Sequence, residues 1–184
     1  MGALMRRAVE ELFKTPAFYR WLEVVTTFAP QGGHAAVRRF RPGLDYTVAH
    51  VGAVGAAATL DATLCFVGGG DTSEEISERW AGGDIGGFEC YIDQDEESKD
   101  EAPEVFKGDD DSDLLSVTAA RNCLSLVLRD KGIMRFIKHV SAAAPSSRAD
   151  VAAVYDIVMP EGDDDDDDEA DDDDDDDDDD DNEE

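Results

Sequence analysis

The apolar residues of the first 30 positions recur at helical spacing. Thr15-Pro16 divides them into two groups, because a threonine hydroxyl caps a helix start and proline suits the first helical position. The apolar positions before this signal are Leu4, Val9, Leu12 and Phe13. Those after it recur at three- and four-residue spacing and are Phe18, Trp21, Leu22, Val25 and Phe28. The pattern predicts two amphipathic helices that cover one face of a sheet.

From Ala36 onward, short apolar runs alternate with turn residues, which is typical of β-strands. Residues 37–40 lead into a turn, and the predicted strands are 46–50, 59–67, 86–92, 114–118, 122–129, 133–140 and one near 150–158. The residues of the second strand that should share one face are Leu60, Ala62, Leu64 and Phe66. Residues 71–84 predict a polar loop, and residues 129–132 predict a hairpin turn. Short strands at this spacing indicate an antiparallel sandwich or jelly roll.

Negative charge is concentrated at the end of the chain. The 184 residues carry a net charge of −30, and residues 161–184 contain 21 acids without Lys or Arg. Removing these 21 acids leaves −9 on the first 160 residues. We expect residues 161–184 to be a disordered tail, because like charges repel and no apolar surface offsets the chain entropy. The acidic insert 93–113 should be a solvated loop.

The same charge argues against direct binding to nucleic acid or to an anionic membrane, since both require clustered Lys and Arg. No apolar run approaches the roughly 20 residues needed to span a bilayer. The cysteines Cys65, Cys90 and Cys123 are widely spaced in apolar segments and form no CxxC motif. They predict buried, reduced core residues and a reducing compartment rather than a zinc site or a disulfide framework. His34 lies in a polar stretch and should be exposed.

Two histidines lie in segments whose spacing matches a non-haem iron site. His139 ends the run MRFIKHV, and Arg148 follows nine positions later. His50 follows an aromatic residue, a glycine and a tyrosine, which are Phe40, Gly43 and Tyr46. Such enzymes hold Fe(II) with two imidazoles and one carboxylate, and an arginine can bind the far carboxylate of 2-oxoglutarate through two hydrogen bonds. These segments resemble those of the prolyl-hydroxylase branch of the non-haem iron oxygenases, and the resemblance implies that His50 and His139 are candidate metal ligands and that Arg148 is the candidate 2-oxoglutarate ligand.

Gly52 stands where the metal-binding aspartate is expected, and residues 51–58 contain no acid. The nearest acids are Asp45 and Asp61. Three interpretations stay open. The two histidines are remnants with ordinary hydrogen bonds; they bind a metal together with a carboxylate from elsewhere; or chloride replaces the carboxylate, as in a halogenase-like site.

Four strings carry a more specific resemblance: FRPGLDYTVAH, LDATLCFV, GGFECYI and NCLSLVLRDKGIMRFIKHVS. Together they resemble the C-terminal domain of the ribosomal prolyl-hydroxylase family, the oxoglutarate and iron-dependent oxygenase degradation C-terminal domain, over about residues 10–158. The resemblance implies a mainly β fold with N-terminal helices, a double-stranded β-helix (jelly roll) that is a degenerate oxygenase barrel. In that family an N-terminal oxygenase domain uses Fe(II), 2-oxoglutarate and ascorbate and hydroxylates a proline of a small-subunit ribosomal protein. The C-terminal domain lacks the metal triad and serves structural support, partner binding and regulation.

We accordingly expect helices over residues 1–30 packed on a barrel over 31–158, followed by the tail over 161–184. The chain alone should be non-catalytic and bind no cofactor itself. Its expected partners are an N-terminal catalytic oxygenase domain that this chain does not contain and a ribosomal or other basic protein, in the nucleus or cytoplasm. One alternative is an active iron dioxygenase with a displaced carboxylate. Another is an acidic chaperone-like binder, in which the tail attracts basic proteins over long range instead of only aiding solubility.

Overall fold

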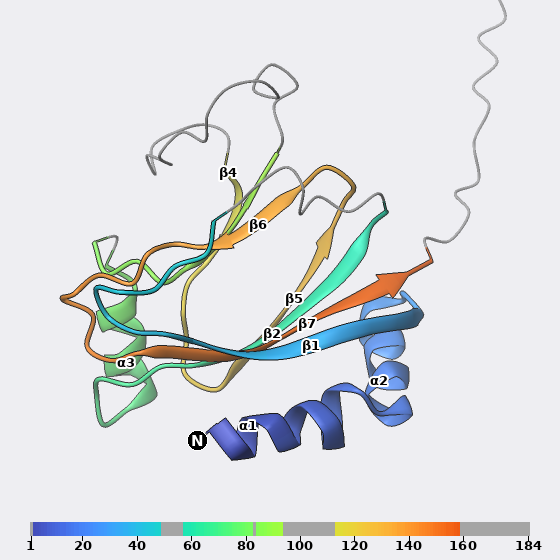
Figure 1. The fold of residues 1–184 in the computed structure, drawn as a ribbon, viewed down its shortest axis with the longest axis horizontal. Helices are drawn as coiled ribbons and strands as arrows, with labels where there is room; N and C mark the ends of the chain where they lie inside the picture. The colour runs from blue at the N-terminus through green and yellow to red at the C-terminus, as the bar shows by residue number, and fades with distance from the viewer. Residues whose placement is uncertain (1, 49–56, 83, 94–112, 159–184) are drawn as a thin grey trace, which may run out of the picture.

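Two antiparallel β-sheets form the body of the protein (Figure 1). The computed structural model describes residues 2–48, 57–82, 84–93 and 113–158. The larger sheet has the order β1-β7-β2-β5 and consists of β1 (Pro30–Phe40), β7 (Arg148–Ile157), β2 (Thr59–Phe66) and β5 (Cys123–Arg129). The smaller sheet has the order β4-β3-β6 and consists of β4 (Asp113–Val117), β3 (Glu89–Ile92) and β6 (Met134–Ile137). The expected mainly β architecture is confirmed.

The described strands do not close into the expected barrel, because no strand of one sheet pairs with a strand of the other. The expected hairpin at residues 129–132 is also wrong. The turn is present, but β5 pairs with β2 whereas β6 pairs with β3. The apolar residues of the two strands are buried in different core clusters. Leu124 and Leu126 of β5 pack against the helix-covered core, whereas Ile137 of β6 lies in a second core cluster. The turn therefore joins the two sheets.

The N-terminal helices cover the outer face of the larger sheet (Figure 1). They are α1 (Gly2–Ala8), the π-helical turn η1 (Val9–Phe13) and α2 (Pro16–Thr26). Thr15 caps α2 as predicted, since its Oγ1 accepts a hydrogen bond of 3.3 Å from the Phe18 N–H. The buried helical side chains are Met5, Val9, Phe13, Phe18 and Leu22. They pack on the alternating face of β2, which was predicted correctly.

Part of the predicted helical stripe is wrong, because four of its members are exposed: Leu4, Leu12, Trp21 and Val25. The helices meet the sheet along the line of Phe13, Phe18 and Leu22 instead. A hydrogen bond of 2.8 Å from the Tyr155 hydroxyl to the Phe13 carbonyl anchors the end of η1 to β7. Among the described residues, no helix is long and apolar enough to cross a bilayer.

The segment expected to be a loop at 71–84 contains the helix α3 (Ser73–Trp80), so that prediction is wrong. Thr72 Oγ1 accepts a hydrogen bond of 3.2 Å from the Glu75 N–H, and the Glu75 carboxylate accepts one of 2.9 Å from the Asp71 N–H. Ile76 and Trp80, one turn apart, are fully buried in the second core cluster. The capping hydrogen bonds and the burial of two residues one turn apart stabilise a helix here, although the surrounding glycines favour a loop.

The strand predicted at 46–50 is not regular over its described part, residues 46–48. Its chain nevertheless runs beside the end of β6, where the Thr47 N–H donates to the Ile137 carbonyl at 3.3 Å. Of the cysteines, Cys65 and Cys90 are buried, and burial raises the pKa of the Cys65 thiol. Cys123 is exposed, which corrects the expectation of three core cysteines. Most of the acidic insert 93–113 and the whole tail 161–184 lie outside the described residues.

Candidate functional site

Charged side chains from both sheets meet between them and form what we call the inter-sheet network. Its carboxylates are Asp61 on β2, Glu89 on β3 and Asp150 on β7, and all three are buried. Its guanidinium groups come from four strands and belong to Arg38, Arg129, Arg135 and Arg148. Four cations thus face three anions. Such ions are retained in a protein interior only when they are paired and hydrogen-bonded.

Arg135 links the smaller sheet to the larger one. Its Nε donates to Glu89 Oε1, its Nη2 donates to Thr63 Oγ1 at 2.6 Å, and its Nη1 lies 3.4 Å from Asp61 Oδ2. Burial by itself would lower the pKa of the Arg135 guanidinium, but the charges of Asp61 and Glu89 raise it by more, so this pKa lies above its ordinary value. Arg129 completes this half of the network, with its Nε 2.9 Å from Asp61 Oδ2.

Arg148 forms the other half and is almost fully buried, with 2% of its side chain exposed. Its Nε donates to Asp150 Oδ2 at 3.1 Å, and its Nη1 donates to the carbonyl oxygen of Gly87. Its Nη2 lies 3.8 Å from Glu89 Oε2. Arg38 binds the same Asp150 carboxylate through two hydrogen bonds of 2.8 and 3.1 Å. Each nitrogen of Arg148 therefore faces an oxygen of the protein itself.

This arrangement does not fit 2-oxoglutarate at Arg148. A ligand carboxylate would need two adjacent N–H groups of the guanidinium, and either pair of adjacent nitrogens includes one that already donates to Asp150 or to Gly87. Displacing them would leave buried carboxylates without part of their pairing, and breaking a buried pair in this way typically costs about 3–5 kcal/mol. Two carboxylate oxygens of the network, Asp61 Oδ1 and Glu89 Oε2, already have no hydrogen-bond donor.

The candidate metal ligands are placed as follows. His139 lies just beyond β6 and is exposed, with its ring 6.2 Å from that of Tyr46 between centroids. His50 and Gly52 lie outside the described residues. Within the described part of the chain, no three His, Cys, Asp or Glu side chains converge in a way that could hold a metal ion.

The two acids nearest the expected ligand position are each bound by arginine. Asp45 accepts hydrogen bonds from Arg41, at 2.7 Å from Nε and 2.9 Å from Nη2, and these bonds hold the pKa of Asp45 well below its usual range. Asp61 is buried in the inter-sheet network. His34 is exposed, as expected, although it lies in β1. Of the two predicted iron ligands, only His139 belongs to the described residues, whereas His50 lies outside them.

The sequence reasoning singled out Arg148 but not its partners in the network. A signal was present in β2, where Asp61 and Thr63 alternate with Leu60, Ala62 and Leu64 and so identify a polar inner face. Such alternation is usually read as a solvated face. Only the smaller sheet, which brings Glu89 and Arg135 over this face, turns it into a buried one.

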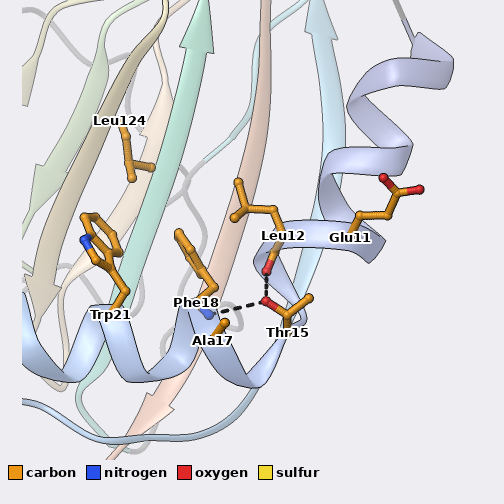
Figure 2. Close-up of a pocket in the computed structure, with 7 residues that line it drawn as sticks. All are labelled: Glu11, Leu12, Thr15, Ala17, Phe18, Trp21 and Leu124. Carbon is orange, nitrogen blue, oxygen red and sulfur yellow. Dashed lines mark hydrogen bonds between the residues drawn. The ribbon is translucent and has the colours of Figure 1, made fainter.

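A second feature is an apolar groove between the helices and the edge strand β5 (Figure 2). Figure 2 shows Phe18 and Trp21 of α2 projecting toward Leu124 of β5, with Leu12 at the other end. The remaining lining residues are Glu11, Thr15 and Ala17. Glu11 is the single titratable residue of this lining, so the groove offers shape and apolar surface but no acid–base or metal chemistry.

Comparison with known proteins identifies the domain. Residues 3–167 match the family described as oxoglutarate and iron-dependent oxygenase degradation C-term. The chain is also 39% identical over 155 residues to the prolyl 3,4-dihydroxylase OGFOD1 of Ostreococcus tauri. That alignment covers 84% of this chain but 29% of the relative, so the chain spans less than a third of the relative's length. The resemblance carried by the four sequence strings is confirmed, and the chain belongs to the C-terminal domain family of the oxoglutarate- and iron-dependent oxygenases.

Proposed function

We propose that this chain is a non-catalytic C-terminal domain of an Fe(II)- and 2-oxoglutarate-dependent prolyl hydroxylase, which serves structural support, partner binding and regulation. The proposal rests mainly on the burial and the hydrogen bonds of Arg148. The residue at the position expected to bind 2-oxoglutarate is buried, donates hydrogen bonds to Asp150 and Gly87, and lies 3.8 Å from Glu89. Gly52, in place of a metal-binding aspartate, supports the same conclusion from the sequence. On this proposal, the fold descends from a double-stranded β-helix whose interior has been filled by ion pairs.

The catalytic partner would supply the chemistry. A separate oxygenase domain would bind Fe(II) and 2-oxoglutarate, with ascorbate as reductant, and would act on a proline of a small-subunit ribosomal protein in the nucleus or cytoplasm. The name of the Ostreococcus tauri relative, a prolyl 3,4-dihydroxylase, supports this choice of reaction class. The inter-sheet network supports the non-catalytic assignment, because its charged groups pair with one another between the two sheets.

The test is metal and cosubstrate binding by the purified chain. After incubation with Fe(II) and 2-oxoglutarate without oxygen, followed by desalting, we expect no stoichiometric iron and no metal-to-ligand charge-transfer absorption. After admission of oxygen we expect no succinate. His50→Ala and His139→Ala serve as matched variants. Stoichiometric iron that both substitutions remove, together with succinate formation, would establish the alternative of an active dioxygenase with a displaced carboxylate.

A further inference from the structure

Two of the three cysteines, far apart in sequence, lie directly opposite each other in the larger sheet. Cys65 near the end of β2 is the partner of Cys123, the first residue of β5, in an antiparallel register. Directly opposed residues of antiparallel strands project their side chains from the same face of the sheet. Here this is the inner face, which also carries Asp61 and Thr63. The two thiols are therefore neighbours.

The geometry of such a pair suits a disulfide. Opposed residues have Cα atoms about 4.5–5.5 Å apart, which lies within the range of about 4.4–6.8 Å found in disulfides. Their Cβ atoms are about 4.5–5.5 Å apart, whereas a disulfide needs about 3.5–4.5 Å, so the strands must approach by up to about 1 Å. β5 can make this movement because it is an edge strand of the larger sheet and pairs only with β2 among the described strands.

The two thiols differ in environment, and the difference sets an order of reaction. Cys123 is exposed, so a small oxidant reaches its sulfur directly. Cys65 is 6% exposed within the second core cluster, so the core shields its sulfur from the oxidant. Burial raises the pKa of the Cys65 thiol, which lowers its reactivity toward the oxidant. An exposed thiol beside a buried one is the arrangement of an oxidised and a resolving cysteine.

We infer that Cys65 and Cys123 form a cross-strand disulfide when hydrogen peroxide oxidises the protein. The Cys123 thiolate attacks one oxygen of hydrogen peroxide, the O–O bond breaks, and a sulfenic acid and hydroxide result. The Cys65 sulfur then attacks the sulfenic sulfur, the S–O bond breaks, and water leaves. Two thiols are oxidised by two electrons in total and one peroxide is reduced to two waters. The bond fastens the edge strand β5 to β2 and closes a loop over residues 66–122, which restricts the unfolded chain.

Peptide mapping tests this directly, because the three cysteines fall in different tryptic peptides. Cleavage after Lys and Arg places Cys65 in 40–79, Cys90 in 80–99 and Cys123 in 122–129. After treatment of the whole chain with hydrogen peroxide, we expect the intact mass to fall by two hydrogens. The thiols titrated in denaturant should fall from three to one, and one cross-linked species should join 40–79 to 122–129. The unfolding temperature should rise, and dithiothreitol should reverse it.

The controls are Cys123→Ser, which should abolish the cross-link, and Cys90→Ser, which should preserve it. The exposure of Cys123 makes its substitution structurally mild. Three free thiols after peroxide, sulfinic acid on Cys123 without a cross-link, a bond to Cys90, or a bond between two chains would each overturn the inference.

Discussion

The substitution Glu89→Gln tests whether the inter-sheet network holds the two sheets together. Glu89 lies at the centre of the network, with 1% of its side chain exposed. It pairs with Arg135 and lies 3.8 Å from both Arg38 and Arg148. Glutamine keeps the shape but removes the charge, so four buried or half-buried guanidinium groups would face two carboxylates instead of three.

The size of the effect follows from the partners that remain. Breaking a buried ion pair costs about 3–5 kcal/mol. The lower end applies here, because Arg135 keeps Asp61 and because Arg38 and Arg148 both keep Asp150. We therefore expect the free energy of unfolding to fall by about 3 kcal/mol. In a domain of this size, this lowers the unfolding temperature by roughly 6–12 °C.

Urea and thermal unfolding followed by circular dichroism measure this loss. Glu78→Gln on the exposed face of α3 is the matched control and should change the free energy of unfolding by less than about 0.5 kcal/mol. Adding Arg135→Met to Glu89→Gln should cost less than the sum of the two single changes, because the pair is then removed as a unit. If Glu89→Gln unfolds like Glu78→Gln, or if the two network changes are additive, the network does not join the sheets.

Three further predictions follow from other parts of the chain. Gly86→Ala should lower the free energy of unfolding by at least about 2 kcal/mol, because Gly86 has a φ of +69° and a Cβ there would collide with the His139 carbonyl. The control is Gly132→Ala, at a φ of +93° with open space around it. In the same urea titration this control should lose only the free energy of the unfavourable backbone conformation, without the collision. Backbone hydrogen bonds from Asp71 and Thr72 lower the pKa of Glu75. The stability that the ionised Glu75 contributes is therefore present above its unfolded pKa of about 4.3 and is lost as the pH falls through the folded pKa. Glu75→Gln should make the loss of stability between neutral and low pH less steep, and an unchanged profile would contradict this. Deleting residues 161–184 should weaken binding of a histone at low salt but not at high salt, since ions screen the charges; equal low-salt affinities would exclude an acidic chaperone-like role for the tail.

Local signals predicted much of the fold. Thr15-Pro16 predicts the start of α2, and the alternation of residues 60–66 predicts both the span and the core face of β2. These features depend on neighbours within a few residues, so a sequence pattern contains them. The helix α3 belongs to the same class: Thr72, Glu75, Ile76 and Trp80 carry its signal, and the flanking glycines led to the wrong prediction of a loop.

The contacts of the candidate site could not be predicted from the sequence. Arg148 was identified by its distance from His139, but the structure shows that it contacts Asp150, Gly87 and Glu89 rather than an open site. Its contacts Glu89, in β3 of the smaller sheet, and Gly87, just before β3, lie some 60 residues away along the chain. Sequence spacing cannot rank such contacts, because many carboxylates compete for each arginine until the sheets are assembled.

The sequence alone determined the family, the helical start, the β-rich body and the acidic tail, since each depends on composition, short-range periodicity or an ordered set of motifs. Only the tertiary structure decided that β5 and β6 belong to different sheets, that charged residues of six strands pair between those sheets, and that Cys65 faces Cys123. The physical reason is the same in each case. Strand pairing and ion pairing are decided by which distant segments bury each other's polar groups, and that competition is settled only when the whole chain has folded.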